Sequence, residues 1–469
     1  MMIRNKQQEQ HLPFIIAVQA ACLLIMGIVE FLNMTKGFLL PVNLPLLTNG
    51  GIVLSLMGLW AVTLWKNNRA VLQRDVILGI LLFAWFLVLE LNRRFNHTPL
   101  QSFTVVAAVY LIALPFAALA QDRDRRMGLR LISGIYVAAA LLLLSLGLIL
   151  LLGGNIPAPL NGHVYWDGPR LLVISHPNIT SRIFMIALAL CMGFCGQAKQ
   201  TWTKVLMLLA AALLFAGIAL TNCRAVVLVS CCILGGNVFS LISRKNRKYI
   251  LLGVVAAMVV AYLLFLSSSC LYQWNYSRLV NQASQHTAQE AALPEDSGLD
   301  VTVASDAVAP ADETQETELA GNSNSGQGTI LSDLPTLNNR TYIWASFIKK
   351  IQQEPAILLR GTVDTRLVLG NLHTHNAWLE ALIMLGLPGF LLILFFSWDT
   401  AWSSLRLILH NGADMFQKNI ALLSLSTMVA ALLEPCLFIT YLEWSFSDFF
   451  FFLCLGYLTL WSKQISFKK

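Results

Sequence analysis

The chain has 469 residues, of which 57% are hydrophobic and only 12% are charged, and its net charge is +7. Soluble proteins average about 25% charged residues, so this composition excludes an ordinary water-soluble globular protein. The basic excess follows the loops between apolar segments, which is a membrane-topology pattern and does not indicate nucleic-acid binding.

Apolar runs long enough to cross a bilayer recur along most of the chain. Because lipid cannot satisfy stray backbone groups, each run predicts a helix. The predicted spans, about twelve, are residues 13–32, 46–65, 75–92, 101–120, 131–152, 180–196, 202–220, 223–241, 248–268, 377–399, 418–441 and 446–462. We therefore predict an all-α polytopic membrane protein, with spans one to nine in residues 1–268 and spans ten to twelve in residues 377–469.

Lysine and arginine favour one orientation, because basic loops resist translocation. Both termini are predicted to be cytoplasmic, in a multi-pass protein of a membrane. The residues predicted inside are Arg4, Lys6, Lys66, Arg69, Arg74, Arg123, Arg125, Arg126, Arg130, Lys199, Lys204, Arg244, Lys245, Arg247, Lys248, Arg406, Lys418, Lys463, Lys468 and Lys469.

A long connection at 269–376 precedes the tenth span and is predicted to be extracytoplasmic. Residues 281–330 hold nine acidic residues and no Lys or Arg, which predicts a disordered insert. Residues 338–354 place apolar side chains three and four apart, which predicts an amphipathic helix. The other outer loop of note, 153–179, is predicted to be irregular, with a re-entrant piece as one possibility.

The usual soluble-enzyme motifs are missing. We find no Gly-rich phosphate loop and no His-Glu-x-x-His helix. The Asp122-Arg123-Asp124 sequence lies in a basic loop, where a solvated topology signal is favoured over a cation site. The nine cysteines lie mostly in apolar runs and predict packing residues. No metal site and no cofactor are predicted.

Polar groups on the predicted outer side are the candidates for chemistry. Arg224 stands between two apolar runs, as either a snorkelling boundary residue or an anion ligand. Arg340 precedes the amphipathic helix and alone is typical of a solvated charge.

The stretch HTHNAWLEALIMLGLPG, residues 373–389, carries the other candidates. Asn376 can cap the helix of the tenth span, and His375 can stay in contact with water. A metal held by His373 and His375 is disfavoured because no third ligand is near. Glu380 and Glu434 are ionisable groups inside spans, where such groups usually face a partner or a polar cavity.

Taken together, two guanidinium groups and a histidine on one membrane face suit group transfer from a lipid pyrophosphate. Arginines stabilise the charge of a departing pyrophosphate. An imidazole with an ordinary pKa of about 6.5 accepts the proton of an incoming hydroxyl near neutral pH.

The chain resembles the O-antigen ligase and polymerase superfamily of bacterial membrane glycosyltransferases. The motifs that carry this resemblance are TNCRAV, the long outer loop, NNRTYIW, LLRG, and HTHN followed by Glu380, Gly386 and Gly389. The resemblance covers most of the chain and is most specific at 339–389. It implies a GT-C-like, metal-independent, inverting transfer of a glycan from undecaprenyl pyrophosphate. The transfer would take place at the outer face of the bacterial cytoplasmic (inner) membrane.

By position, the resemblance implies that Arg224 and Arg340 bind the pyrophosphate and that His375 activates the acceptor. Asn376 and Glu380 would shape the site, and Asn178 matches a Pro-Asn pair of similar proteins. The chain departs from the family pattern at Cys223-Arg224-Ala225, where Ser-Arg-Gly is usual, and at Gly361-Thr362-Val363, where Gly-x-Gly is usual.

The sequence leaves the identity of the acceptor open. A ligase would use lipid A core or another glycan or protein acceptor, whereas a polymerase would extend a second lipid-linked glycan. A flippase for the same lipid is a further alternative, disfavoured because the polar groups gather on one face and no repeat is evident.

Overall fold

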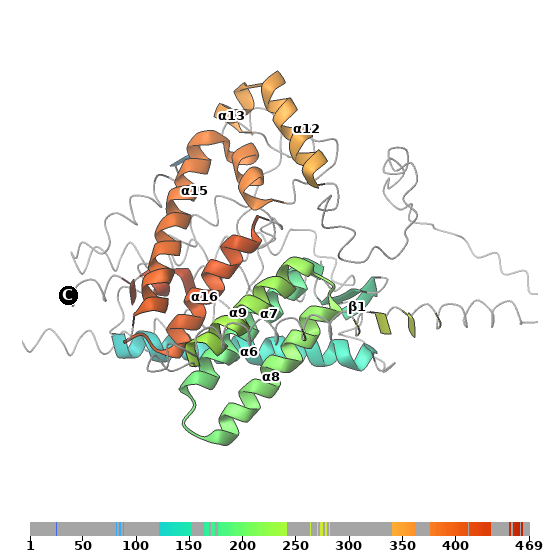
Figure 1. Ribbon diagram of the computed structural model, residues 1–469, viewed down its shortest axis with the longest axis vertical. Helices are drawn as coiled ribbons and strands as arrows, with labels where there is room; N and C mark the ends of the chain where they lie inside the picture. The colour runs from blue at the N-terminus through green and yellow to red at the C-terminus, as the bar shows by residue number, and fades with distance from the viewer. Residues whose placement is uncertain are drawn as a thin grey trace, which may run out of the picture.

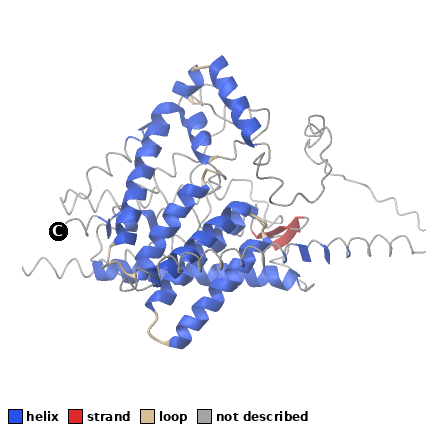
Figure 2. Ribbon diagram, in the orientation of Figure 1, coloured by secondary structure: helices blue, strands red, loops and turns tan. Residues whose placement is uncertain are grey.

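The computed structural model describes most of residues 122–241, 340–361 and 376–432, parts of a helix between 450 and 462, and single residues such as Trp85. The structure is mostly helical, with one small hairpin (Figure 2). Four of its helices are long and apolar enough to cross a membrane. Three of them, Leu129–Ile149, Pro177–Gln197 and Thr201–Leu220, coincide with the predictions at 131–152, 180–196 and 202–220. The fourth, Leu385–Leu409, begins and ends later than the predicted span at 377–399. The predictions at 13–32, 46–65, 75–92, 101–120, 248–268 and 281–330 lie largely outside the described residues.

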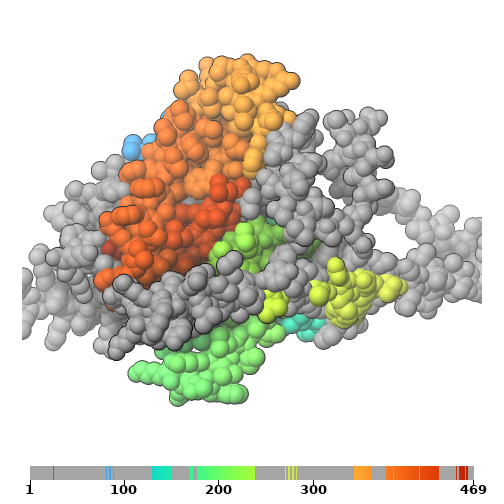
Figure 3. Space-filling view, viewed as in Figure 1, coloured from blue at the N-terminus to red at the C-terminus, as the bar shows by residue number. Residues whose placement is uncertain are grey.

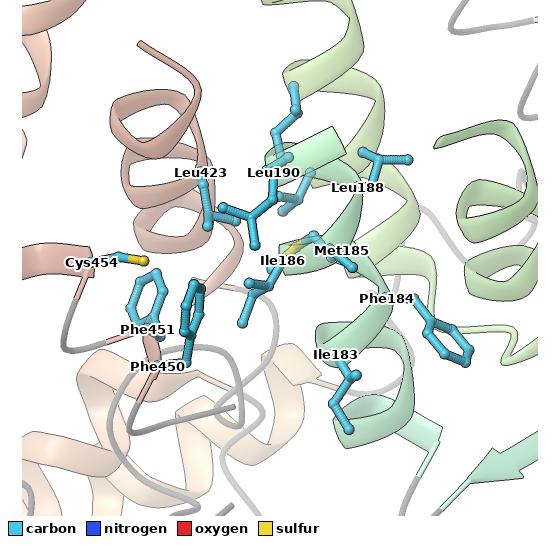
Figure 4. Close-up of a cluster of buried hydrophobic side chains, with 14 of the residues drawn as sticks. Ile183, Phe184, Met185, Ile186, Leu188, Leu190, Leu423, Phe450, Phe451 and Cys454 are labelled. Atoms are coloured by element: carbon cyan, nitrogen blue, oxygen red, sulfur yellow. The ribbon is translucent and has the colours of Figure 1, made fainter. Parts of the chain in front are cut away.

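The central helix of the described bundle is α7 (Pro177–Gln197), and most of its residues are buried. Helices α6 (Asp122–Leu151), α8 (Thr201–Leu220), α9 (Arg224–Leu241) and α16 (Met415–Ala430) surround it (Figure 1). Residues 450–462 add helical turns, and Phe450 and Phe451 pack into the same core as Ile186 of α7 and Leu423 of α16 (Figure 4). An apolar helix in a membrane can face lipid or protein, so apolarity alone does not place α7 at the centre. Its polar residues Thr180, Ser181 and Arg182 are buried, and such groups are favoured inside a bundle over contact with lipid.

Two polar contacts tie the bundle together. Asn237 of α9 and Asn419 of α16, both buried, exchange amide hydrogen bonds of 2.6 and 2.9 Å. Arg130 of α6 contacts Asp414 at 3.3 Å, and Asp414 also caps α16 in a reciprocal capping box with Gln417. Both contacts lie toward the start of α16.

The connection between α6 and α7 is more ordered than predicted. Val164–Asp167 (β1) and Arg170–Val173 (β2) pair as an antiparallel hairpin. The irregular interpretation of 153–179 is therefore wrong for these residues, and the re-entrant alternative stays a prediction. Leu171 of the hairpin is fully buried against Gly147 of α6. Apolar residues on both strands favour pairing here, and the intervening Gly-Pro is a turn dipeptide.

Helix α15 (Ala377–Leu409) is broken, whereas the sequence predicted one span at 377–399. Gly386 has φ 65° and ψ 177°, a conformation open almost only to glycine. It separates a short arm (377–385) from a long arm (387–409), which turns back along the bundle (Figure 1). Pro388 lacks an N–H, so the helix ladder fails here. The indole N–H of Trp85 donates to the carbonyl of Leu385 at 2.8 Å.

Helices α12 (Arg340–Gln353) and α13 (Ala356–Arg360) cover the short arm (Figure 3). The cluster that joins α12 to the short arm contains Ile343, Phe347 and Ile383, with Trp344, Ile351 and Leu379 at its edge. It is separate from the main core. The amphipathic helix at 338–354 is therefore present, although Ile348 of its apolar pattern is 54% exposed.

Helix α16 is shorter than the predicted span at 418–441. It ends at Ala430, and residues 431–432 form a turn. Pro435 provides the physical reason, because its ring would clash with the carbonyl of Ala431 in a continued helix. The predicted span at 223–241 corresponds to α9, whose apolar portion, Arg224–Asn237, is shorter than a full span.

Candidate functional site

Three of the predicted site residues lie at the starts of three helices. Asn178 is the second residue of α7, Arg224 is the first residue of α9, and Asn376 is the N-cap of α15. They come from segments up to 198 residues apart in the chain. Their use as one site requires that these three helix starts lie at the same end of the bundle.

Helix α16 provides the common reference, because it packs against both α7 and α9. A Cβ at Gly193 of α7 would lie 3.1 Å from the Cα of Phe416. Asn237 of α9 is hydrogen bonded to Asn419. In both pairs the end of one helix meets the start of α16. Helices α7 and α9 therefore run antiparallel to α16 and begin where α16 ends.

These helix starts also lie at similar heights along the bundle axis. Asn178 precedes Gly193 by fifteen residues, and Ala431 follows Phe416 by fifteen. Arg224 precedes Asn237 by thirteen, and Leu432 follows Asn419 by thirteen. At a rise of about 1.5 Å per residue, both helices begin within about one turn of the level of Ala431.

The short arm of α15 begins at that same level. The backbone N–H of Ala377 donates to the carbonyl of Ala431 at 2.8 Å. Residue 435 is a proline and has no N–H, so it could not donate to this carbonyl in a continued helix. The structure thus brings the starts of α7, α9 and α15 together at one end of the bundle, which we call the site end.

Asn376 is held as a helix cap. Its side-chain oxygen accepts from the N–H groups of Trp378 and Leu379 at 2.9 and 3.1 Å, and the residue is 8% exposed. These bonds satisfy two donors that a helix start leaves open. Asn376 therefore fixes the direction of the short arm, whatever else it contacts.

Glu380 lies one turn further along the short arm and is 2% exposed. An acidic side chain in the first turn of a helix interacts favourably with the helix dipole. The residue is enclosed by protein, which is where an ionisable group of a membrane protein is expected.

Arg340 begins α12, beside the short arm. Both α12 and the short arm end near α13, since Leu359 and Gly361 contact Gly386. The apolar cluster joins the two helices along their length. Arg340 and Asn376 therefore begin neighbouring helices that run in the same direction (Figure 1). His375 lies outside the described residues and directly precedes Asn376 in the chain.

The site end has the electrostatics of an anion site. Helix starts carry partial positive charge, and those of α7, α9 and the short arm lie at one level. In the short arm the first N–H groups are already bonded, Ala377 to Ala431 and Trp378 and Leu379 to Asn376, so this helix contributes through its dipole. Arg224 adds a full charge there and is exposed. Such an arrangement can hold a phosphate or pyrophosphate group. Among the described residues, no three His, Cys, Asp or Glu side chains gather in a way that could hold a metal ion.

One charged residue near the site end was missed by the sequence analysis. Arg182 lies in the second turn of α7 and is 5% exposed. An ionisable residue within an apolar helix was the available signal. The β1–β2 hairpin, which contacts α6 and α7, was also missed.

Comparison of the chain with protein-family models, with curated proteins and with solved structures finds no match.

Proposed function

We propose that the chain is an O-antigen ligase-like glycosyltransferase that moves a glycan from undecaprenyl pyrophosphate to an acceptor hydroxyl. The observation that carries the proposal is the common level of the starts of α7, α9 and α15. Asn178, Arg224 and Asn376 share that end of the bundle, and the chain neighbour of Asn376 is His375. The family resemblance of the sequence and this arrangement support the same chemistry.

In the proposed reaction, the acceptor oxygen attacks the anomeric carbon of the donor sugar, and the bond to the pyrophosphate oxygen breaks with inversion. The acceptor proton passes to His375, and undecaprenyl pyrophosphate leaves. Arg224, Arg340 and the helix starts stabilise the negative charge that develops on the leaving group. Asn376 fixes the direction of the helix that follows His375. Glu380 belongs to the first turn of that helix, and its side chain forms part of the site.

The distribution of charge supports an outer-face site. The opposite end of the bundle, where α8 and α16 begin, carries Lys199, Lys204, Arg406 and Lys418. Basic residues favour the cytoplasmic side, so the site end faces outward in this proposal. Lipid-linked glycans assembled for the cell envelope would meet the site there, within the bacterial inner membrane.

The test is transfer by the purified protein in lipid vesicles. The donor is a glycan on undecaprenyl pyrophosphate, EDTA is present, and the acceptors are lipid A core and a second lipid-linked glycan. We expect transfer by the wild type and a loss of at least about 100-fold in His375→Ala, the range typical of removing a general base. Arg340→Ala and Arg224→Ala are expected to raise the KM for donor and to lower kcat.

The controls are His410→Ala and Arg406→Gln, which change the same residue types at the opposite end of the bundle. Both are expected to transfer at the wild-type rate. Full activity of His375→Ala would overturn the assignment of the base. Transfer to lipid A core identifies a ligase, and extension of the second lipid-linked glycan identifies a polymerase. Movement of glycan across the bilayer without a new glycosidic bond would overturn the transferase in favour of a flippase.

A further inference from the structure

The β1–β2 hairpin carries a charge that the proposed reaction has not yet used. Arg170 is the first residue of β2, lies opposite Asp167 across the turn, and is exposed. In the described part of the chain, no hydrogen bond or ion pair of its guanidinium is found. An exposed arginine alone is usually a solvated charge, so its position in the fold decides whether it can serve a site.

The backbone that carries Arg170 is firmly anchored. The next two residues, Leu171 and Leu172, are only 0% and 4% exposed. The hairpin contacts α6, α7 and α8. Arg170 therefore extends from an ordered element one residue away from a buried anchor, which is the kind of support that a binding group needs.

The anchor lies at the outward end of α6. Arg130, in the first part of α6, contacts Asp414 at the opposite end of the bundle, so α6 runs toward the site end. A Cβ at Gly147 would lie 2.8 Å from the side chain of Leu171. The apolar span of α6 ends at Ile149, two residues after Gly147. The hairpin is thus at the boundary of a predicted membrane span (Figure 1).

The same height is reached from α8. A Cβ at Gly217 of α8 would lie 2.6 Å from Leu144 of α6. Both helices run toward the site end, so three residues further on Gly147 and Leu220 lie at one height. Arg224 follows Leu220 by four residues, after a turn. The anchor of the hairpin and the start of α9 therefore share the site end.

The chain path also keeps the hairpin close to the start of α7. Four residues separate the end of β2 at Val173 from Pro177, which limits that distance to about 14 Å even for extended chain. The hairpin packs on the α6 and α8 side of α7. The short arm, in contrast, is hydrogen bonded to the end of α16, and α12 packs on the short arm.

This arrangement suits the second substrate of the proposed reaction. Neighbouring helices pack about 8–10 Å apart, so Arg170 lies within one or two helix spacings of Arg224. In an inverting displacement, the acceptor approaches the anomeric carbon from the side opposite the leaving group. The leaving pyrophosphate is assigned to Arg224 and Arg340, and the hairpin offers a cation on another side of the same end.

We propose that the hairpin binds the acceptor and that Arg170 pairs with a phosphate or carboxylate group of that acceptor. This inference rests on the proposed function and names the acceptor class, a lipid-anchored anionic saccharide. The position at the end of a span places Arg170 where the sugars of a lipid-anchored glycan meet the bilayer. A planar guanidinium binds phosphate or carboxylate oxygens in pairs, which an ammonium group cannot.

The test compares two acceptors that differ only in charge. One is a phosphorylated lipid-anchored oligosaccharide, and the other is the same molecule after removal of its phosphates. The wild type, Arg170→Gln and Arg170→Lys are assayed with the undecaprenyl pyrophosphate glycan donor in phosphatidylcholine vesicles, and again in vesicles that contain phosphatidylglycerol. The measurements are the KM for acceptor, the KM for donor and the unfolding temperature in detergent.

We expect Arg170→Gln to raise the KM for the phosphorylated acceptor about five- to tenfold, the range for a charge-assisted hydrogen bond that is partly open to solvent. The KM for the dephosphorylated acceptor, the KM for donor and the unfolding temperature should equal those of the wild type. Arg170→Lys should give an intermediate KM. Arg406→Gln, the same residue type at the opposite end of the bundle, is the matched control and should change none of these values.

Four outcomes overturn the inference and leave the proposed transferase in place. The first is an unchanged KM for acceptor in Arg170→Gln, and the second is an equal rise for both acceptors. The third is an effect confined to vesicles with phosphatidylglycerol, which would assign Arg170 to a lipid headgroup. The fourth is a clearly lower unfolding temperature, which would assign it to the fold. If the wild type transfers glycan to no acceptor, including a second lipid-linked glycan, the proposed function itself fails.

Discussion

At the scale of single residues, Asn376 combines two tasks that can be separated by substitution. Its side-chain oxygen caps the short arm, and the proposed site places it beside the donor. Asn376→Ala removes the cap oxygen and should cost about 1 kcal/mol of unfolding free energy, the usual value for a lost N-cap. Asn376→Asp keeps the oxygen and adds a negative charge that the helix dipole favours.

We therefore expect Asn376→Asp to unfold near the wild-type temperature and Asn376→Ala below it. The order of the variants in glycan transfer should differ from their order in unfolding temperature. The carboxylate added in Asn376→Asp repels a pyrophosphate and raises the KM for donor. Thermal unfolding in detergent and steady-state transfer measure the two properties. Wild-type KM in Asn376→Asp would show that the residue is a cap alone.

The residue-scale predictions from sequence depended on local chemistry. The cap at Asn376 was predictable because an asparagine before an apolar run has a direct physical use. The burial of Arg182 was not, since an arginine near the predicted start of a span at 180 is equally typical of a snorkelling boundary residue. Only the packing of α7 on all sides distinguishes the two.

At the scale of elements, the break in α15 depends on Gly386. A Cβ at this position would lie 2.7 Å from the carbonyl oxygen of Leu359 and 3.0 Å from the amide nitrogen of Gly361, both backbone atoms of the α13 segment. The backbone conformation alone disfavours a side chain by about 1–3 kcal/mol. We expect Gly386→Ala to lower the unfolding temperature and to abolish transfer, because α13 and the short arm must separate.

Gly134 of α6 provides the control for this prediction. Nothing lies within 4 Å of a Cβ placed there, and the residue is inside a helix. Gly134→Ala should therefore stabilise the protein by about 0.5–1 kcal/mol, the usual gain in a helix interior. Equal unfolding temperatures for Gly386→Ala and the wild type would contradict the role of this break.

Helices and strands were predictable where one regular spacing of apolar residues dominated the sequence. The apolar helices and the amphipathic α12 follow directly from hydrophobic length and spacing. The break at Gly386 does not follow from hydrophobic spacing, because the apolar run continues through it. Pro388 marked the position, but the contact with α13 is tertiary and leaves no local pattern. The four-residue strands of the hairpin were too short for a period-2 pattern to stand out.

At the scale of the whole molecule, the proposed site depends on three helix starts that lie at the same height along the bundle. Single-sequence span ends are uncertain by a few residues, which is about one helical turn. The sequence could therefore assign Arg224 and Asn376 to one membrane face but could not align them. The alignment comes from tertiary contacts of α16: the Asn237–Asn419 pair, the packing of Gly193 on Phe416, and the Ala377–Ala431 hydrogen bond.

This alignment makes a topology prediction that single cysteines can test. Gln353 ends α12 beyond the site end, and Gln200 lies in the turn between α7 and α8 at the opposite end; both are exposed. If the site end faces outward, a membrane-impermeant maleimide applied to intact spheroplasts should label Gln353→Cys. Gln200→Cys should be labelled only after the membrane is opened, and the wild type reports labelling of native thiols. The reverse pattern would place Arg224 and Asn376 on the cytoplasmic side, where a lipid-linked glycan exported for the envelope is no longer present.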